Sequence, residues 1–215
     1  MTGSAAEPVT GPVTGHLTGP VTGRVTGSAT GPVAGSAPVP VADVAGLIRA
    51  RIRDVPDFPT PGVLFRDISP LLADPIAFMA VAGVIARQHR DADLVAGVEA
   101  RGFLLAGAIG YASRLGVVPI RKAGKLPAPT VAATYALEYG EATIELPAAA
   151  FDGANRVVIV DDVLATGGTL LAAVDLVRRA GGEVAGVSVI MDLEPLGGRD
   201  RLAGHGIEVH TLLTL

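Results

Sequence analysis

From about position 43 onward, apolar residues fall into two alternating patterns. Short unbroken runs rich in Val, Ile and Leu are typical of strands buried on both faces, and apolar residues three or four apart are typical of helices. Strands are predicted over residues 94–98, 117–121, 157–160, 183–191 and 208–213, with a hairpin within 137–146. Helices are predicted over residues 43–53, 74–90, 102–115 and 168–180. This alternation predicts an α/β fold, in which helices flank both faces of a mostly parallel sheet.

Proline, glycine and aspartate mark the ends of several predicted elements. The dipeptide Asp74-Pro75 is a typical helix start, with the carboxylate as cap and proline in the first turn. The dipeptide Gly181-Gly182 ends the last predicted helix. The Pro-rich residues 54–61 cannot form a helix, and the polar residues 122–134 are predicted to be a loop.

Residues 1–42 differ in composition from the rest of the chain. Glycine recurs about every fourth residue in units such as PVTG, and the only charged side chains are Glu7 and Arg24. A four-residue period fits neither a helix nor a strand, and Pro and Gly together oppose a regular strand ladder. We therefore expect a disordered, low-complexity tail over residues 1–42 and a folded domain over residues 43–215.

Composition excludes several classes of function. The 215 residues include no Cys, which excludes disulfides, thiolate metal sites and a cysteine nucleophile. The net charge of −4 provides no general attraction for nucleic acid or an anionic membrane. The nearest approach to a membrane-spanning run, residues 76–86, is too short. We expect a cytoplasmic protein without nucleic-acid or membrane partners, in which any bound anion is held by a local site.

The strand and turn at residues 157–170, VVIVDDVLATGGTL, carry the strongest chemical signal. A buried strand delivers Asp161 and Asp162 to the carboxyl edge of the sheet, where ligands bind in this fold class. The small residues that follow let backbone amides approach an anion at a helix start, and Thr166 and Thr169 add hydroxyl groups. This pattern predicts a phosphate site, with carboxylates beside it for sugar hydroxyls or Mg²⁺.

Four hydrophobic residues, two acids and ATGGT resemble the PRPP signature of the type I phosphoribosyltransferases. Three further segments narrow the resemblance to the adenine phosphoribosyltransferases: DFPTPGVLFRDISPLL at 57–72, EARGFLLAG at 99–107, and RKAGKLPAPT with YALEYG within 121–140. The resemblance implies the type I phosphoribosyltransferase fold, with a small hood and a flexible loop. It implies transfer of the phosphoribosyl group of PRPP to adenine, which yields AMP and pyrophosphate. It also implies Mg²⁺ as the cofactor and a homodimer whose loops meet across the interface.

The same resemblance assigns roles to individual residues. The residues implied to bind PRPP are Ala100, Arg101, Arg121, Lys122, Lys125, Tyr139, Asp161, Asp162, Ala165, Thr166, Gly167, Gly168 and Thr169. The residues implied to hold adenine are Leu64, Phe65, Arg66 and Val163. Phe65 would stack on the purine, and Arg66 would act through its backbone. Glu138 is the implied acid or base, Arg101 the implied catalytic cation, and Asp161 and Asp162 the candidate ligands of a Mg²⁺ bound through PRPP.

On the residues alone, these assignments have plain structural alternatives. Phe65 could be a core residue, Arg101 a solvent-facing residue at a helix start, and Glu138 an exposed residue of a hairpin. The basic segment around Ala123 and Ala128 could be a solvated loop, and its two alanines stand where glycine would favour movement.

Three other functions compete with the adenine transferase. A hydrolase is unsupported, because neither Ser113 nor Ser188 has a base in a recognised motif, and the four histidines show no metal-ligand spacing. A regulator of the same fold would bind PRPP or a purine and would carry a DNA-binding domain, but residues 1–42 show no helical pattern. A transferase for xanthine or orotate would share the signature at 157–169 and differ in its base pocket.

Overall fold

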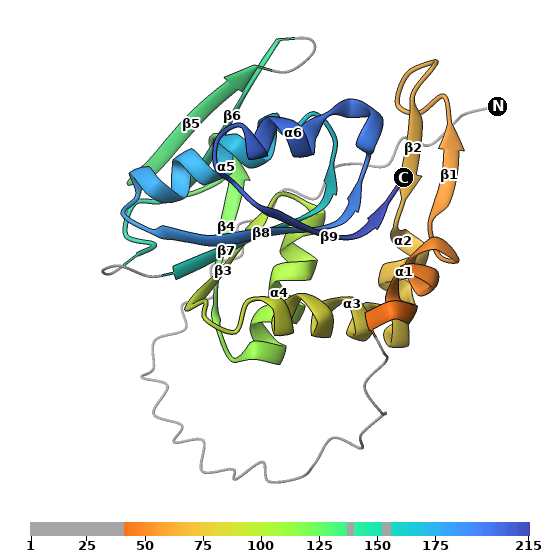
Figure 1. Ribbon diagram of the computed structural model, residues 1–215. Helices are drawn as coiled ribbons and strands as arrows, with labels where there is room; N and C mark the ends of the chain where they lie inside the picture. Colours follow the sequence, from red (N-terminus) through yellow and green to blue (C-terminus); the bar gives the residue numbers. More distant parts are fainter. Residues whose placement is uncertain (1–40, 137–139, 152–155) are drawn as a thin grey trace, which may run out of the picture. The chain divides into compact units, whose positions relative to one another are not determined.

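The computed structural model describes residues 41–136, 140–151 and 156–215 (Figure 1). The predicted tail over residues 1–42 therefore lies outside the described residues, except for its last two, and so do Glu138 and Tyr139. The first helix begins at Val41, two residues before the predicted start of the folded domain.

The predicted helices and strands are all present. The helices are α1 (Val41–Arg49), α2 (Ser69–Ala73), α3 (Pro75–Gln88), α4 (Arg101–Ser113), α5 (Gly168–Arg179) and α6 (Gly198–Ala203), with a 3-10 helix over Glu194–Leu196. The strands are β1 (Arg53–Pro56), β2 (Leu64–Asp67), β3 (Leu94–Val98), β4 (Gly116–Lys122), β5 (Thr130–Ala136), β6 (Glu141–Pro147), β7 (Arg156–Leu164), β8 (Glu183–Asp192) and β9 (Val209–Thr214). Among the described residues, no helix combines the length and the apolar character needed to span a membrane.

Seven strands form one mixed sheet in the order β5-β6-β4-β3-β7-β8-β9 (Figure 1). The strands from β4 to β9 in this order run parallel, which confirms the predicted mostly parallel sheet. Strand β6 joins β4 in antiparallel register, with Arg121 opposite Glu145, and β5 pairs antiparallel with β6 along its whole length. Strands β1 and β2 form a separate two-stranded antiparallel sheet.

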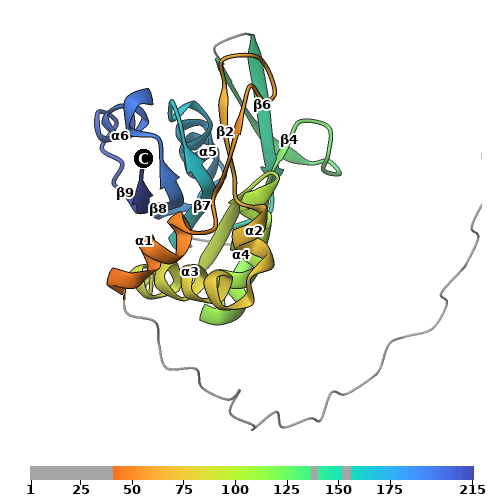
Figure 2. The ribbon, with the colours of Figure 1, turned by 90° about the vertical axis from the view of Figure 1, so that its right-hand side faces the viewer.

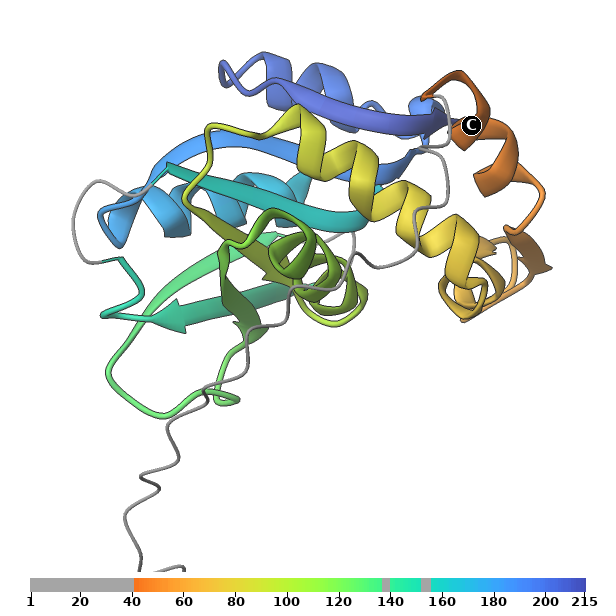
Figure 3. The ribbon, with the colours of Figure 1, turned by 90° about the horizontal axis from the view of Figure 1, so that it is seen from below.

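Strand β7 is buried on both faces because helices cover the sheet from both sides. Val157 and Ile159 belong to the hydrophobic core on the α5 side, and Val158 and Val160 belong to the core formed with α1, α3 and α4. All four side chains are fully buried. Figure 3 shows α3 and α4 against one face of the sheet, with α5 on the other. The unbroken apolar run in the sequence is therefore the mark of a central strand.

Asp74 caps helix α3 as the sequence predicts. Its Oδ1 accepts hydrogen bonds from the backbone amides of Ile76 (2.9 Å) and Ala77 (3.0 Å), and Pro75 occupies the first turn, where no amide partner is needed. The Nε of Arg51 pairs with the other carboxylate oxygen at 2.6 Å. These contacts, with the amide of Ala77 foremost, lower the pKa of Asp74. The cap fixes where α3 starts and therefore which residues of α3 face the hydrophobic core.

Two of the sequence predictions are wrong in part. Residues 122–134 are not all loop, because β5 starts at Thr130 as an edge strand that exposes one face to solvent and packs Ala133 inward. The helix predicted over 43–53 ends at Arg49, and strand β1 of the two-stranded sheet begins at Arg53. The short helices α2 and α6 were not predicted, because six residues or fewer show no helical repeat of apolar positions.

Two hairpins stand on the same side of the domain (Figure 2). The Pro-rich residues 54–61, predicted only to be non-helical, form most of β1 and the turn toward β2. Within this hairpin the rings of Phe58 and Phe65 meet edge to face, with centroids 5.1 Å apart. The hairpin predicted within 137–146 includes residues 137–139, which lie outside the described residues; the pairing of β5 with β6 ends with Ala136 opposite Glu141.

A buried polar contact joins the end of α3 to strand β8. The Nε2 of His89 lies 2.7 Å from the Oγ of Ser188, and the His89 ring meets that of His210 edge to face at 5.0 Å. The sequence offers no catalytic base for Ser188, whereas in the structure His89 lies beside it. Because Ser188 is 0% exposed, no substrate reaches the pair. Burial lowers the pKa of His89 from 6.5 to about 4, and its electrostatic interaction with nearby His210 acts in the same direction.

Acid is expected to destabilise this fold through His89. Between pH 6.5 and about 4 the unfolded chain binds a proton that the folded chain does not, so stability falls as the pH is lowered through this range. On acidification over this range, the free energy of unfolding should fall less in His89→Gln than in the wild type, by up to about 3 kcal/mol. Urea unfolding at pH 7.5 and pH 4 measures it, with the exposed His205→Gln variant as control. An unchanged pH dependence in His89→Gln would contradict the prediction.

Candidate active site

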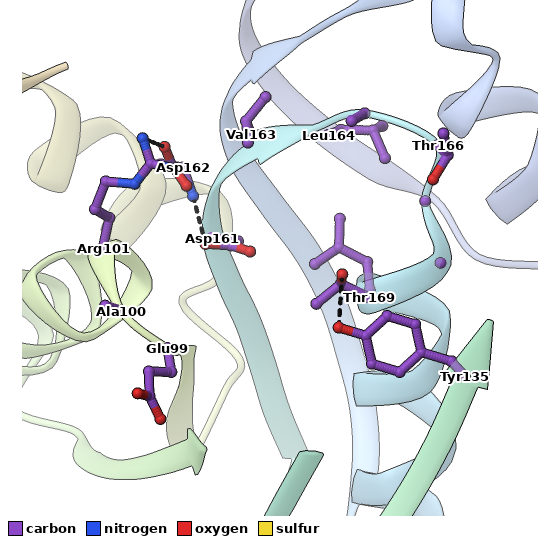
Figure 4. Close-up of a pocket in the computed structure, with 14 residues that line it drawn as sticks. Glu99, Ala100, Arg101, Tyr135, Asp161, Asp162, Val163, Leu164, Thr166 and Thr169 are labelled. Atoms are coloured by element: carbon purple, nitrogen blue, oxygen red, sulfur yellow. Dashed lines mark hydrogen bonds and ion pairs between the residues drawn. The ribbon is translucent and has the colours of Figure 1, made fainter. Parts of the chain in front are cut away.

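A pocket of about 220 Å³ opens at the carboxyl ends of β3 and β7, where the turn into α5 begins (Figure 4). Because β3 and β7 are parallel neighbours, the residues that follow each strand meet at one edge of the sheet. The residues that line the pocket are Glu99, Ala100, Arg101, Tyr135, Asp161, Asp162, Val163, Leu164, Ala165, Thr166, Gly167, Gly168, Thr169 and Leu170. The structure thus brings together most of the residues that the resemblance assigns to PRPP, and it adds Glu99 and Tyr135.

Both carboxylates at the end of β7 line this pocket. Asp162 is buried and Asp161 is half-buried, and the amide of Asp162 donates a hydrogen bond of 2.9 Å to Oδ1 of Asp161. Burial raises the pKa of Asp161 well above its ordinary value, and the neighbouring charge of Asp162 raises it further. Burial also raises the pKa of Asp162, although the guanidinium of Arg101 opposes this rise. The pair therefore holds its protons more tightly than exposed aspartates do.

Arg101 lies between the two carboxylates and the β1–β2 hairpin. Its Nη1 is 2.9 Å from Oδ2 of Asp162, and its guanidinium carbon lies 5.3 Å from the centroid of the Phe65 ring. The short distance between Arg101 and Asp162 depends on Gly102, because a Cβ there would lie 2.7 Å from the carbonyl oxygen of Val160. The start of α4 can approach the end of β7 only without a side chain at that position.

A second hollow, of about 390 Å³, lies on the other side of Arg101. It is lined by Arg53, Val55, Phe58, Phe65, Asp67, Ser69 and Arg101. Its aromatic and aliphatic walls, next to a pocket of carboxylates and hydroxyls, provide a place for a flat apolar group beside a polar one.

The turn from Ala165 to Gly168 is supported from behind by α6. A Cβ on Gly198, at the start of α6, would collide with the carbonyl oxygen of Ala165. Nη1 of Arg201 donates to the carbonyl oxygen of Thr166 at 3.3 Å. Gly167 caps α5 with a φ of 79°, a left-handed conformation that favours glycine. The first amides of α5 lack carbonyl partners within the helix, so this held turn presents donors to an anion.

Glu99 and Tyr135 are the pocket residues outside the stretch 157–170 that the sequence did not single out. Glu99 accepts a hydrogen bond from the amide of Lys122 at 3.0 Å and pairs with Nε of Arg121 at 3.3 Å. These contacts, with the Lys122 amide foremost, lower the pKa of Glu99. The hydroxyl of Tyr135 accepts a hydrogen bond from Oγ1 of Thr169 at 3.1 Å. The signal for Glu99 was its place at the end of a predicted strand, directly before Ala100 and Arg101.

The basic residues at the end of β4 and just after it, Arg121, Lys122 and Lys125, do not line the pocket. Arg121 faces Glu99 and donates from Nη1 to the carbonyl oxygen of Lys125 at 2.9 Å, while the amide of Lys125 donates to Glu145 at 3.0 Å. The side chain of Lys122 is exposed. In this arrangement the segment is tied to the sheet edge beside the pocket.

The residues predicted to hold the base are divided between the two cavities. Phe65 lines the aromatic hollow and Val163 lines the carboxylate pocket, with Arg101 between them. Leu64 is 46% exposed, and the side chain of Arg66 pairs with Asp54, away from both cavities. This leaves the backbone of Arg66 as its only part available for the predicted contact.

The carboxylates fit a metal ion that takes part of its coordination from a bound ligand. The described residues contain no group of three or more His, Cys, Asp or Glu that could hold a metal by themselves. Oδ2 of Asp162 is buried and makes no hydrogen bond within the described part of the chain, although it pairs with the charge of Arg101. Two adjacent carboxylates that line one pocket suit Mg²⁺, which usually keeps waters and substrate oxygens as ligands.

Comparison with known proteins identifies the relatives of this chain. The model of the phosphoribosyl transferase domain matches residues 67–202. The adenine phosphoribosyltransferase of Salinispora tropica is 56% identical over 175 residues, which cover 80% of this chain and 92% of that protein. Among solved structures, the adenine phosphoribosyltransferase from Rhodothermus marinus has 44% identity and a TM-score of 0.76, covering 81% of this chain and 99% of its own. The enzyme from Saccharomyces cerevisiae, complexed with adenine and an imino-altritol bisphosphate, has 34% identity and a TM-score of 0.75, covering 80% and 99%.

The charge of Asp161 is expected to cost stability. Since burial and Asp162 raise its pKa, the folded state is penalised whenever the pH is high enough to ionise Asp161. Asp161→Asn should therefore raise the midpoint of thermal unfolding at pH 8, and this gain should shrink at lower pH as the wild-type carboxyl takes up its proton. Activity should fall by about ten- to hundredfold, because a charged hydrogen-bond acceptor is lost.

Thermal unfolding and steady-state rates measure the two effects of this substitution. Asp175→Asn is the matched control, because Asp175 is an exposed carboxylate on α5. An Asp161→Asn variant that is less stable than the wild type at pH 8 would show that the surroundings compensate the charge.

Proposed function

The chain belongs to the adenine phosphoribosyltransferases of the phosphoribosyl transferase family, and we propose from this membership how its residues carry out the reaction. The enzyme serves purine salvage: it transfers the phosphoribosyl group of PRPP to adenine, which yields AMP and pyrophosphate. One observation carries the assignment of residues. The loop at Ala100 and Arg101 meets the turn from Asp161 to Thr169 in one pocket, beside a hollow that contains Phe65.

PRPP occupies the carboxylate pocket. Its 5′-phosphate binds the turn from Ala165 to Thr169, where unpaired amides at the start of α5 and two threonine hydroxyls supply donors. The ribose hydroxyls donate to Asp161 and Asp162, which are acceptors when ionised. The diphosphate binds at Ala100 and Arg101, since a guanidinium can pair with two phosphate oxygens.

Adenine enters between the two cavities. Phe65 stacks on one face of the purine and Val163 packs on the other, while Leu64 and the backbone of Arg66 hold the purine edge. Two observations support this placement. Phe65 lines the hollow next to the pocket that contains Val163, and the Arg66 side chain is engaged elsewhere by Asp54.

In the reaction, the bond from the anomeric carbon to the diphosphate oxygen breaks and a bond to a purine nitrogen forms. The purine nitrogen loses its proton, and Glu138, in the segment between β5 and β6, is the residue proposed to act as acid or base in this proton transfer. Negative charge grows on the diphosphate as it leaves, and Arg101 stabilises it there. Further binding comes from Arg121 and Lys122 at the end of β4, from Lys125 in the segment that follows it, and from Tyr139 between β5 and β6.

Mg²⁺ is the proposed cofactor, held through PRPP with Asp161 and Asp162 as its protein ligands. When bound, it neutralises charge on the diphosphate. The two adjacent carboxylates in one pocket support this proposal.

We also propose a homodimer, a cytoplasmic location and a division of the chain into a tail over residues 1–42 and a catalytic domain over residues 43–215. The relatives support the last proposal, because they match about 80% of the chain. Adenine, PRPP, AMP and pyrophosphate are the proposed ligands, without nucleic acid or membrane partners.

Pyrophosphate release from PRPP and Mg²⁺, measured in parallel with adenine, hypoxanthine, guanine, xanthine and orotate, tests the function. Adenine should react at least a hundredfold faster than the other bases, because hydrogen bonds to a substrate edge discriminate strongly. Turnover of a different base would retain the PRPP site and overturn the base specificity. PRPP binding without turnover of any base would indicate a regulator of the same fold.

Glu138→Gln is expected to lower kcat by about a hundredfold, because general acid–base catalysis contributes on that scale. The KM for PRPP should change little, since phosphate and ribose contacts are unaffected. Glu141→Gln is the matched control, because Glu141 is an exposed residue at the start of β6. A Glu138→Gln variant with wild-type kcat across the pH range would mean that Glu138 takes no part in proton transfer.

A further inference from the structure

Tyr135 connects the edge strand β5 to the start of helix α5, two parts of the chain that are far apart in the sequence. It lies near the end of β5, the edge strand, whereas Thr169 lies in the first turn of α5. The Tyr135 hydroxyl nevertheless accepts a hydrogen bond from Oγ1 of Thr169 at 3.1 Å, and both residues line the carboxylate pocket (Figure 4).

The ring of Tyr135 is held independently of this hydrogen bond. It packs as a half-buried residue against the hydrophobic core on the α5 side. A Cβ on Gly168 would lie 3.6 Å from Cδ2 of Tyr135 and 3.6 Å from the carbonyl oxygen of Ala136, so the end of β5 covers the first turn of α5 at contact distance. The ring therefore fixes where the hydroxyl lies, and removal of the hydroxyl alone leaves that packing in place.

A hydroxyl pair next to a phosphate has a preferred direction. Phosphate oxygens only accept, so one hydroxyl of the pair must donate to the phosphate and the other must donate to its partner. Thr169 lies in the first turn of α5, where the phosphate is proposed to bind, whereas Tyr135 reaches the pocket from β5. The favoured chain therefore runs from Tyr135 to Thr169 to the phosphate, and each hydrogen bond in such a chain strengthens the next.

We infer that Tyr135 is a positioning residue for the phosphate end of the substrate. When phosphate binds, the hydrogen bond seen between the two hydroxyls reverses, and Tyr135 donates to Thr169. Thr169 then directs its own proton at the phosphate. No bond is made or broken covalently, and Tyr135 itself touches neither the base nor the diphosphate. This inference rests on the proposed function only in taking the 5′-phosphate as the group bound at Thr169.

Tyr135→Phe removes the donor and keeps the ring. It is expected to weaken AMP binding about tenfold and to raise the KM for PRPP by a similar factor, because a hydrogen bond to a charged group is lost indirectly. The kcat at saturating PRPP, the affinity for free adenine and the midpoint of thermal unfolding should stay at wild-type values. Calorimetric titration with AMP and with adenine, together with steady-state kinetics, measures these quantities. Tyr111→Phe is the matched control, because Tyr111 is 87% exposed on α4.

A double-mutant cycle separates positioning from packing. In a Thr169→Val background, Tyr135→Phe should cause no further loss of AMP affinity, because the chain of donors is already broken. Equal losses in both backgrounds would overturn the inference, as would wild-type AMP affinity in Tyr135→Phe. The proposed function fails separately, since it requires that the wild type bind AMP and release pyrophosphate from PRPP.

Discussion

Two adjacent carboxylates at the end of a strand buried on both faces are the constraint on which this site depends. A central strand can carry charge only where the sheet ends, so Asp161 and Asp162 must lie at its carboxyl edge. There the cost of burial is partly offset by one cation, Arg101, which the parallel neighbour β3 delivers to the same edge. The pocket, its charge and its position in the fold thus follow from one arrangement of strands.

Much of this could be predicted from the sequence because the signals are local. The Val-rich run, the aspartate pair and the glycine turn are contiguous, so the strand, the pocket at its carboxyl end and the turn into α5 follow from short-range rules. The cap at Asp74 is local in the same way, and its predicted hydrogen bonds are present.

What the sequence did not predict is non-local. The contact of Tyr135 with Thr169 spans 34 positions and depends on β5, an edge strand that begins inside the segment predicted to be a loop. The link from Glu99 to Arg121 requires that β4 lie beside β3. The support from α6 requires a helix too short to show a repeat. Sequence periodicity reports which face of an element is buried, but it does not report which distant element covers that face.

The close approach of Gly198 to the turn after β7 affects how genetic data on this enzyme should be interpreted. Gly198 has no functional group, yet the carbonyl oxygen of Ala165 leaves no room for even a methyl group at this position unless the turn moves. A saturation mutagenesis screen scored by growth would therefore rank Gly198 beside the residues that touch substrate. Intolerance to substitution at this position measures free space, and only direct ligand-binding data distinguish it from chemistry.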